Sequence, residues 1–264
     1  MEKLTLLLTF SLFTVFGFTQ NLPEIFSSIQ VKMKDGHSPP EMTNYIKDLN
    51  RGLDKFGRGV QFWMSYGDRG ERKQQLVYGF AFDFKANRDY YFPIPDDNSD
   101  NGNPQFQALA QKMANAGYSV NQDIMEEDPY TDWVCVGFDK LINPQLGGLV
   151  AVRGLPLKSG VEMDFEKFVT SELYPAFSKN MEGLDAYVYK GDRGAGKGSY
   201  IFLWSFDTVQ RRNSYFPTEE GDPSEAFNKA YESVSAVMDK LNSFISEEAT
   251  SVPFTDYVRV DVGQ

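Results

Sequence analysis

Residues 67–93 read GDRGERKQQLVYGFAFDFKANRDYYFP, and residues 191–217 read GDRGAGKGSYIFLWSFDTVQRRNSYFP. The two stretches share 11 of 27 positions at a constant offset of 124 residues, where unrelated sequences of this composition share about one or two. The same offset relates residues 129–136 to residues 253–260, which share the pattern Pro-aromatic-Thr-Asp-aromatic-Val. We infer an internal duplication.

Both copies are predicted to contain the same order of elements, from the spacing of their apolar residues. The first copy is expected to have a strand at 29–33, a helix from the cap Ser38 to Phe56, strands at 60–66 and 75–84, a helical turn at 88–93, a helix from 103 and a strand at 131–137. The second is expected to have a strand at 148–155, a helix at 165–177, strands at 184–189 and 199–208, a long helix at 222–245 and a strand at 255–260. Each copy therefore reads β-α-β-β-α-β, the ferredoxin-like unit.

The sheet of one such unit carries helices on one face, so its other face must be buried elsewhere. We therefore expect an α+β fold in which tandem ferredoxin-like repeats pack as a pseudo-dimeric α+β barrel. The repeats are assigned to residues 20–137 and 148–264, with 138–147 as the linker. Residues 20–28 are expected to be a short linker before the first strand.

The N-terminus and the overall charge indicate compartment and partners. Residues 4–18 are apolar apart from Thr, Ser and Gly, which is the length of a signal-peptide core, and residues 1–19 are assigned as a signal peptide. An uncleaved membrane anchor is the alternative; otherwise we expect an exported protein, periplasmic or secreted, with no membrane segment after cleavage. The formal net charge of −11 and a pI near 4.7 argue against nucleic acid as a partner. The oligomeric state stays open.

The duplicated layout resembles the dimeric α/β-barrel superfamily, which includes the antibiotic-biosynthesis-monooxygenase-like proteins. It is most similar to exported bacterial proteins in which Gly-Asp-Arg-Gly precedes an aromatic strand and a Tyr-Phe-Pro turn, here at 191–194, 200–207 and 215–217. The resemblance covers both copies, most clearly the second. It implies the ferredoxin-like barrel and no particular reaction.

Polar residues that occur in both copies are interpreted as structural. A ligand-binding role for the arginines is the alternative, but a duplicated fold needs its turns in both halves, whereas a pocket usually specialises one of them. Asp68-Arg69 and Asp192-Arg193 are therefore expected to form hairpin tips in which Asp bonds the turn backbone and Arg pairs locally. The other members of this repeated set are Arg88, Tyr91, Arg212 and Tyr215.

Residues that differ between the copies are the candidate ligand-binding residues. If the strand faces that carry them point into the barrel, they line an aromatic cavity with a few polar groups. The set comprises Trp63, Trp133, Tyr187, Tyr189, Trp204, Tyr257 and Arg259. The alternative is that these aromatic side chains fill the space between the sheets.

Metal and cofactor sites have little support in the sequence, so no cofactor is expected. The single cysteine, Cys135, lies in a predicted strand and is interpreted as a small buried hydrophobe. The single histidine, His37, has no counterpart in the second copy, so haem bound through it or through a tyrosine is a minor alternative. The acidic loop 96–102 does not fit the EF-hand spacing in either register, which leaves weak calcium binding or a solvated loop.

The sequence is compatible with three functions. The first is non-catalytic binding of a small apolar or aromatic ligand between the sheets. The second is a cofactor-free oxygenase or isomerase in which Tyr187, Tyr189, Tyr257 or Arg259 orients an ionisable substrate. The third is a structural or assembly module with a filled core. Fold alone cannot select among these.

Overall fold

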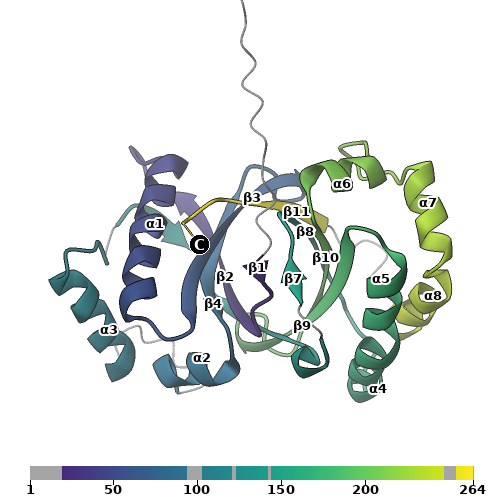
Figure 1. The fold of residues 1–264 in the computed structure, drawn as a ribbon, viewed down its shortest axis with the longest axis horizontal. Helices are drawn as coiled ribbons and strands as arrows, with labels where there is room; N and C mark the ends of the chain where they lie inside the picture. The colour runs from purple at the N-terminus through teal and green to yellow at the C-terminus, as the bar shows by residue number, and fades with distance from the viewer. Residues whose placement is uncertain (1–19, 94–102, 121–122, 142–143, 247–253, 264) are drawn as a thin grey trace, which may run out of the picture.

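The computed structural model describes residues 20–93, 103–120, 123–141, 144–246 and 254–263. Eight strands close into an antiparallel barrel in the order β4-β3-β11-β8-β10-β9-β6-β2, and β2 pairs back to β4. Figure 1 shows helices α1 to α3 outside one half of this barrel and α4 to α8 outside the other. The expected α+β fold, tandem ferredoxin-like repeats packed as a pseudo-dimeric barrel, is confirmed.

The first half of the barrel is built from one run of elements. These are β2 (Ile25–Met33), α1 (Pro39–Phe56), β3 (Val60–Gly70), β4 (Leu76–Phe82), α2 (Lys85–Tyr91), α3 (Pro104–Asn115), β5 (Met125–Glu127) and β6 (Thr131–Cys135). Two short strands, β1 (Gln20–Asn21) and β7 (Gln145–Leu146), precede β2 and β8, and a 3₁₀ turn, η1 (Phe138–Lys140), follows β6.

The second half repeats the order of the first. Its elements are β8 (Leu149–Gly154), α4 (Glu162–Phe168), the π-helical turn η2 (Val169–Leu173), α5 (Tyr174–Asn180), β9 (Leu184–Gly194), β10 (Tyr200–Phe206), α6 (Val209–Tyr215), α7 (Glu225–Glu232), α8 (Ser235–Phe244) and β11 (Phe254–Arg259). The long helix expected at 222–245 is therefore two helices, because the chain turns at Ser233 and Val234 before α8 begins.

The helices form where the sequence supplies an apolar stripe and a suitable first turn. Helix α1 buries Met42, Ile46 and Leu53 against the sheet, and prolines occupy its first turn. Ser38 stands at its N-cap position, but its side chain makes no capping hydrogen bond. Helix α3 is capped by Asn103, whose side chain accepts from the backbone of Gln105 and Phe106.

Strand alternation divides the apolar residues into two outer cores and one barrel interior. The outer core of the first half lies between α1, α3 and the sheet, and that of the second half lies under α4 to α8. The inward positions form two smaller clusters, one around Tyr187, Tyr189 and Leu203 and one around Val77 and Tyr257. The helices cover the outer face of the sheet and the barrel encloses its inner face. Both faces of the strands therefore carry apolar residues.

The expected linker at residues 20–28 is wrong. Strand β2 already begins at Ile25, where it pairs with Phe82 of β4 and Val134 of β6. The preceding strand β1 pairs with β7, and these two strands lie over one mouth of the barrel (Figure 1). Leu22 next to β1 is almost fully buried among the interior residues. The pairing of β1 with β7 therefore caps this end of the barrel.

The repeated Gly-Asp-Arg-Gly does not form the hairpin tip that was expected. In each copy it is the end of a long strand, and it pairs with the other half of the barrel. Gly70 lies opposite Thr255 and Gly194 lies opposite Thr131, so β3 joins β11 and β9 joins β6. We call these two junctions the β3–β11 seam and the β9–β6 seam.

Arginine side chains fasten both seams, and their hydrogen bonds reach across to the opposite half of the barrel. Arg69 donates to the carbonyl of Phe216 at 2.6 Å and to Asn213 at 2.9 Å, beside α6. Arg193 donates to the carbonyl of Phe92 at 2.5 Å and to Asp89 at 2.8 Å, beside α2.

A fully buried arginine lies behind each seam. Arg88 of α2 contacts Asp132 Oδ2 at 2.6 Å and Asp192 Oδ2 at 2.5 Å, so it links β6 of its own half to β9 of the other. Arg212 of α6 makes the matching contacts with Asp256 and Asp68. The two tyrosines of the repeated set close loops nearby, because Tyr91 accepts from the backbone of Arg58 and Tyr215 donates to Glu182.

Candidate functional site: a cavity inside the barrel

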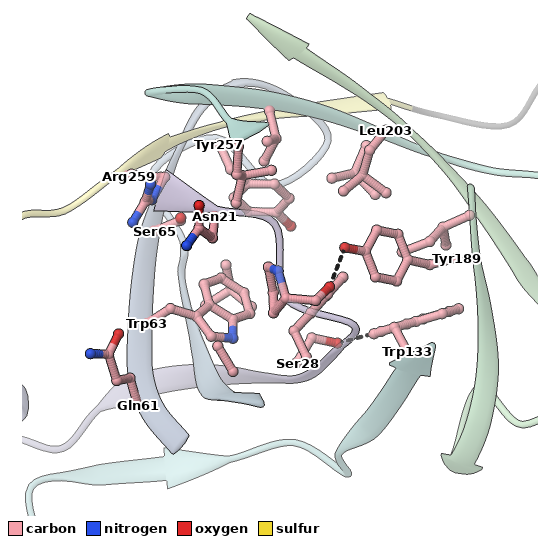
Figure 2. A pocket seen from close by; sticks show the side chains of 18 of the residues that line it. Asn21, Ser28, Gln61, Trp63, Ser65, Trp133, Tyr189, Leu203, Tyr257 and Arg259 are labelled. Carbon is pink, nitrogen blue, oxygen red and sulfur yellow. Dashed lines mark hydrogen bonds between the residues drawn. The ribbon is translucent and has the colours of Figure 1, made fainter. Parts of the chain in front are cut away.

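The interior of the barrel contains a cavity of about 800 Å³. It is lined from both halves, and Figure 2 shows its wall from close by. At one end it reaches Arg72 and Thr255 near the hairpin that follows β3; at the other it reaches Gln61 and Arg259, where β3 begins and β11 ends. The cavity therefore extends along the length of the barrel.

Side chains alternate between the two faces of β3 and β11, and the inward ones form the polar part of the cavity wall. Gln61, Trp63 and Ser65 are consecutive inward positions of β3, and Thr255, Tyr257 and Arg259 are those of β11. Arg259 lies directly opposite Ser65 in the pairing of the two strands. A single seam thus contributes a guanidinium, an amide, two hydroxyls of Ser and Thr, and two aromatic rings.

Aromatic rings form the remaining wall, and hydrogen bonds fix them. Phe26 meets Trp63 edge to face with ring centres 5.7 Å apart, and it meets Tyr189 in the same way at 4.7 Å. The indole N–H of Trp63 donates to the carbonyl of Ser27 at 3.0 Å, and that of Trp133 donates to Ser28 Oγ at 2.8 Å. These bonds orient the rings before any ligand arrives.

The two halves of the cavity differ where the two seams carry different residues. The β9–β6 seam has Tyr189 and Cys135 at the positions where the β3–β11 seam has Ser65 and Arg259. Figure 2 shows Gln61, Ser65 and Arg259 on one side of the cavity and Tyr189 and Leu203 on the other. The ring of Tyr189 therefore takes up space beside the β9–β6 seam that Ser65 leaves open beside the β3–β11 seam.

Burial controls the protonation of the interior groups. Burial lowers the pKa of Arg259 to about 10, which leaves it cationic at neutral pH. Burial raises the pKa of Tyr257, and it raises that of Tyr189 well above the usual value. Burial also raises the pKa of the Cys135 thiol to about 12. The tyrosine hydroxyls are therefore hydrogen-bond donors at neutral pH and not bases.

Two of the candidate residues lie elsewhere than expected. Trp204 is on the outer face of β10, where it stacks on Phe216 at 5.6 Å and packs against Phe227 under α6 and α7. Tyr187 faces inward, but its hydroxyl donates to the carbonyl of Gln145 at 2.9 Å. It therefore supports the β1–β7 cap and is absent from the cavity wall. The other five candidates, Trp63, Trp133, Tyr189, Tyr257 and Arg259, line the cavity.

Several lining residues had no signal in the sequence. Small and aliphatic side chains of β4 and β8 create much of the open space, among them Val77, Ala81, Val150 and Val152. Such residues are typical of any buried strand, so composition cannot single them out. Arg72 also lines the cavity, although it belongs to a connection rich in charged residues.

Among the described residues, no group of three or more His, Cys, Asp or Glu side chains could hold a metal ion. His37 contacts Glu41 at the start of α1 at 3.0 Å and lines no part of the cavity, so it does not fit a haem ligand there. The loop 96–102 considered for calcium and the segment 1–19 assigned as a signal peptide lie outside the described residues. No helix in the described part of the chain is both long enough and apolar enough to cross a membrane.

No protein-family model matches the sequence, and no curated protein matches it. Solved structures do match in fold. A "putative monooxygenase" of Lactobacillus acidophilus NCFM has a TM-score of 0.50 and 9% identity, covering 90% of this chain and 94% of that one. An anthrone oxidase-like protein has a TM-score of 0.45 and 12% identity, covering 93% and 97%. The chlorite dismutase of Candidatus Nitrospira defluvii in complex with imidazole has a TM-score of 0.46 and 7% identity, covering 89% and 91%.

These neighbours belong to the ferredoxin-like dimeric α/β-barrel superfamily. At such identities the likeness shows the fold alone, and the function has to be argued from the cavity.

Proposed function

We propose that the protein binds one small apolar or aromatic molecule inside the barrel, between its two sheets. The observation that carries this proposal is the cavity of about 800 Å³ inside the barrel. Ligand cavities in proteins measure roughly 300–1,000 Å³ and combine apolar walls with a few convergent polar groups. The wall described above has this composition.

The cavity argues against the alternative of a structural module with a filled core. Interiors of proteins are close-packed, so open space of this size lowers stability unless something occupies it. At the position that matches Ser65, the other half of the barrel carries the ring of Tyr189 instead. The fold itself therefore does not require the opening.

The alternative of a cofactor-free oxygenase or isomerase uses the same cavity but needs a group that exchanges protons. Burial raises the pKa values of Tyr189 and Tyr257, which disfavours the tyrosinate that a general base requires. The Tyr189 hydroxyl already donates to the carbonyl of Pro23 at 3.0 Å, so this residue contacts a ligand through its ring. Non-catalytic binding is accordingly the function that the geometry supports best.

The binding proposal is tested by placing in the open half the residue that fills the other half. Ser65 is matched by Tyr189, so Ser65→Tyr introduces a ring at a position where this fold already accommodates one. We expect the neutral fluorescent probe N-phenyl-1-naphthylamine to bind the wild-type protein with one-to-one stoichiometry. In Ser65→Tyr its affinity should fall at least about tenfold, because a lost buried aromatic contact is worth more than about 1.4 kcal/mol.

The control for this experiment is Ser178→Tyr, which adds the same ring at an exposed position of α5. It should leave the probe titration unchanged. Equal loss in both variants, or no saturable binding to the wild-type protein, would refute the proposal. Thermal unfolding of each variant establishes that the comparison is made between folded proteins.

We also propose that the chain is exported and that the mature protein starts at Gln20. The strand β1 begins at this residue and pairs with β7, so the folded body can start directly at the expected cleavage site. Intact-mass measurement of protein purified from an exported fraction should give the mass of residues 20–264. Recovery of the uncleaved chain from the membrane fraction would contradict this assignment.

A further inference from the structure

We propose that the ligand of the barrel cavity is an aromatic or apolar anion, and that Arg72 binds its acidic group at the hairpin end of the cavity. This inference rests on the proposed binding function and specifies the chemical class of the ligand. It assigns a recognition role to a residue outside the set that the sequence singled out.

Arg72 is held at the mouth of the cavity by the connection between β3 and β4. Its backbone N–H donates to Thr255 Oγ1 at 3.4 Å, which fixes the connection against β11. Its side chain is half-buried and lines the cavity together with Tyr257. The charge of Arg72 acts on the Tyr257 hydroxyl, where it opposes the rise in pKa that burial causes. The guanidinium therefore lies close to the ring that forms this part of the wall.

One terminal nitrogen of this guanidinium has no partner. Arg72 Nη1 is shielded from solvent, and no acceptor among the described residues lies within hydrogen-bonding distance of it. A buried donor without an acceptor costs about 1–3 kcal/mol, and more when the group is charged. An acidic group of a ligand would supply the acceptor, and a planar guanidinium can bind a carboxylate or sulfonate through two parallel hydrogen bonds.

The other hairpin shows that the fold does not need this arginine. The position that matches Arg72 is Gly196, although the next residue is lysine in both hairpins, Lys73 and Lys197. A side chain at Gly196 would meet Thr131 and the ring of Trp133 at about 3 Å, so the space there is already occupied. The cation is thus found on the seam beside the open half of the cavity, and it is absent from the filled half.

The distribution of carboxylates favours binding of an anionic group at the Arg72 end of the cavity over the Arg259 end. Asp54 and Asp83 line the cavity at the Arg259 end, and Asp54 already accepts from Gln61 at 3.3 Å. At the Arg72 end the lining carboxylate is Glu71, which is exposed. An anion therefore meets less opposing charge near Arg72.

A matched pair of probes tests this inference. The compound 1-anilinonaphthalene-8-sulfonate has the ring skeleton of N-phenyl-1-naphthylamine and adds one sulfonate. We expect the wild-type protein to bind the sulfonate probe about tenfold more tightly than the neutral probe, as a hydrogen-bonded charge pair predicts. Arg72→Gln should abolish this preference and change the affinity for the neutral probe by less than about threefold.

Three further variants locate the effect. Lys73→Gln removes the same charge one residue away, from a side chain that is exposed and paired with Glu219 at 2.7 Å, and it should preserve the preference. Arg259→Gln should preserve it as well. Arg72→Lys should retain part of it, since the charge stays and the planar donor pair is lost.

The outcomes separate the two proposals. A wild-type protein that binds the neutral probe but prefers the sulfonate by less than about threefold would overturn the role of Arg72 and leave the binding function standing. The role of Arg72 would also be overturned if the preference for the sulfonate probe were lost in Arg259→Gln and kept in Arg72→Gln. It would be overturned as well if Arg72→Gln lowered the affinities for both probes equally. Failure of both probes to bind the wild-type protein would refute the binding function itself.

Discussion

Replacing Arg88 with methionine is expected to lower the free energy of unfolding by about 3–5 kcal/mol. Arg88 is fully buried and contacts Asp132 at 2.6 Å and Asp192 at 2.5 Å, which belong to different halves of the barrel. Removing the cation leaves the buried carboxylate of Asp132 uncompensated, and this penalty dominates the loss. Equilibrium urea denaturation measures the effect.

The matched control is Lys85→Met, which removes a cation from the same helix. Lys85 contacts Asp89 at 2.6 Å with both side chains partly exposed to solvent, so its loss should cost less than about 1 kcal/mol. The triple variant Arg88→Met, Asp132→Asn, Asp192→Asn should recover part of the loss, because it removes the uncompensated charges. A similar, small effect of Arg88→Met and Lys85→Met would show that the buried ion pairs do not hold the seam together.

Gly70→Ala is expected to destabilise the protein by about 3 kcal/mol or more. Gly70 has a φ of +87°, and an added Cβ would lie 2.1 Å from the carbonyl oxygen of Phe254. A side chain here must therefore push β3 away from β11, besides straining the backbone. Thermal and urea unfolding of the variant would measure both effects together.

The backbone strain can be separated from the clash with Gly198→Ala. Gly198 has nearly the same φ, +83°, but nothing lies within 4 Å of an added Cβ. This variant should lose about 1–2 kcal/mol from strain alone. The difference between the two variants reports the close approach of the strands at the seam, and equal losses would contradict that account.

The identities between residues 67–93 and 191–217 made the overall fold predictable from the sequence. A matched order of elements in two copies leaves few arrangements that bury both open sheet faces. The repeated polar residues were also recognisable as a set. Their geometry was not, because Gly-Asp-Arg-Gly is typical of a turn and its pairing with the opposite half depends on strands that are far apart in the chain.

The facing of strand β10 could not be read from its sequence. Phe202, Trp204 and Phe206 alternate with Ile201 and Leu203, so both faces are apolar and periodicity does not decide which one points inward. The structure places Trp204 outside and Leu203 inside. The facing of β11 was accessible, because Tyr257 and Arg259 alternate with valines.

The β1–β7 cap and Arg72 illustrate two further limits of the sequence. Strands of two residues carry no periodic pattern, and the partners Asn21 and Gln145 are far apart in the chain. Arg72 stands among charged residues of a turn, where a solvated side chain is the usual expectation. Its buried nitrogen becomes evident when the connection is placed against β11.

Native mass spectrometry with excess N-phenyl-1-naphthylamine tests most directly whether the barrel interior is a binding site. We expect a single one-to-one adduct on the wild-type protein and on Ser178→Tyr, and no adduct on Ser65→Tyr. An absent adduct on the wild-type protein, or adducts of equal abundance on all three proteins, would contradict this expectation.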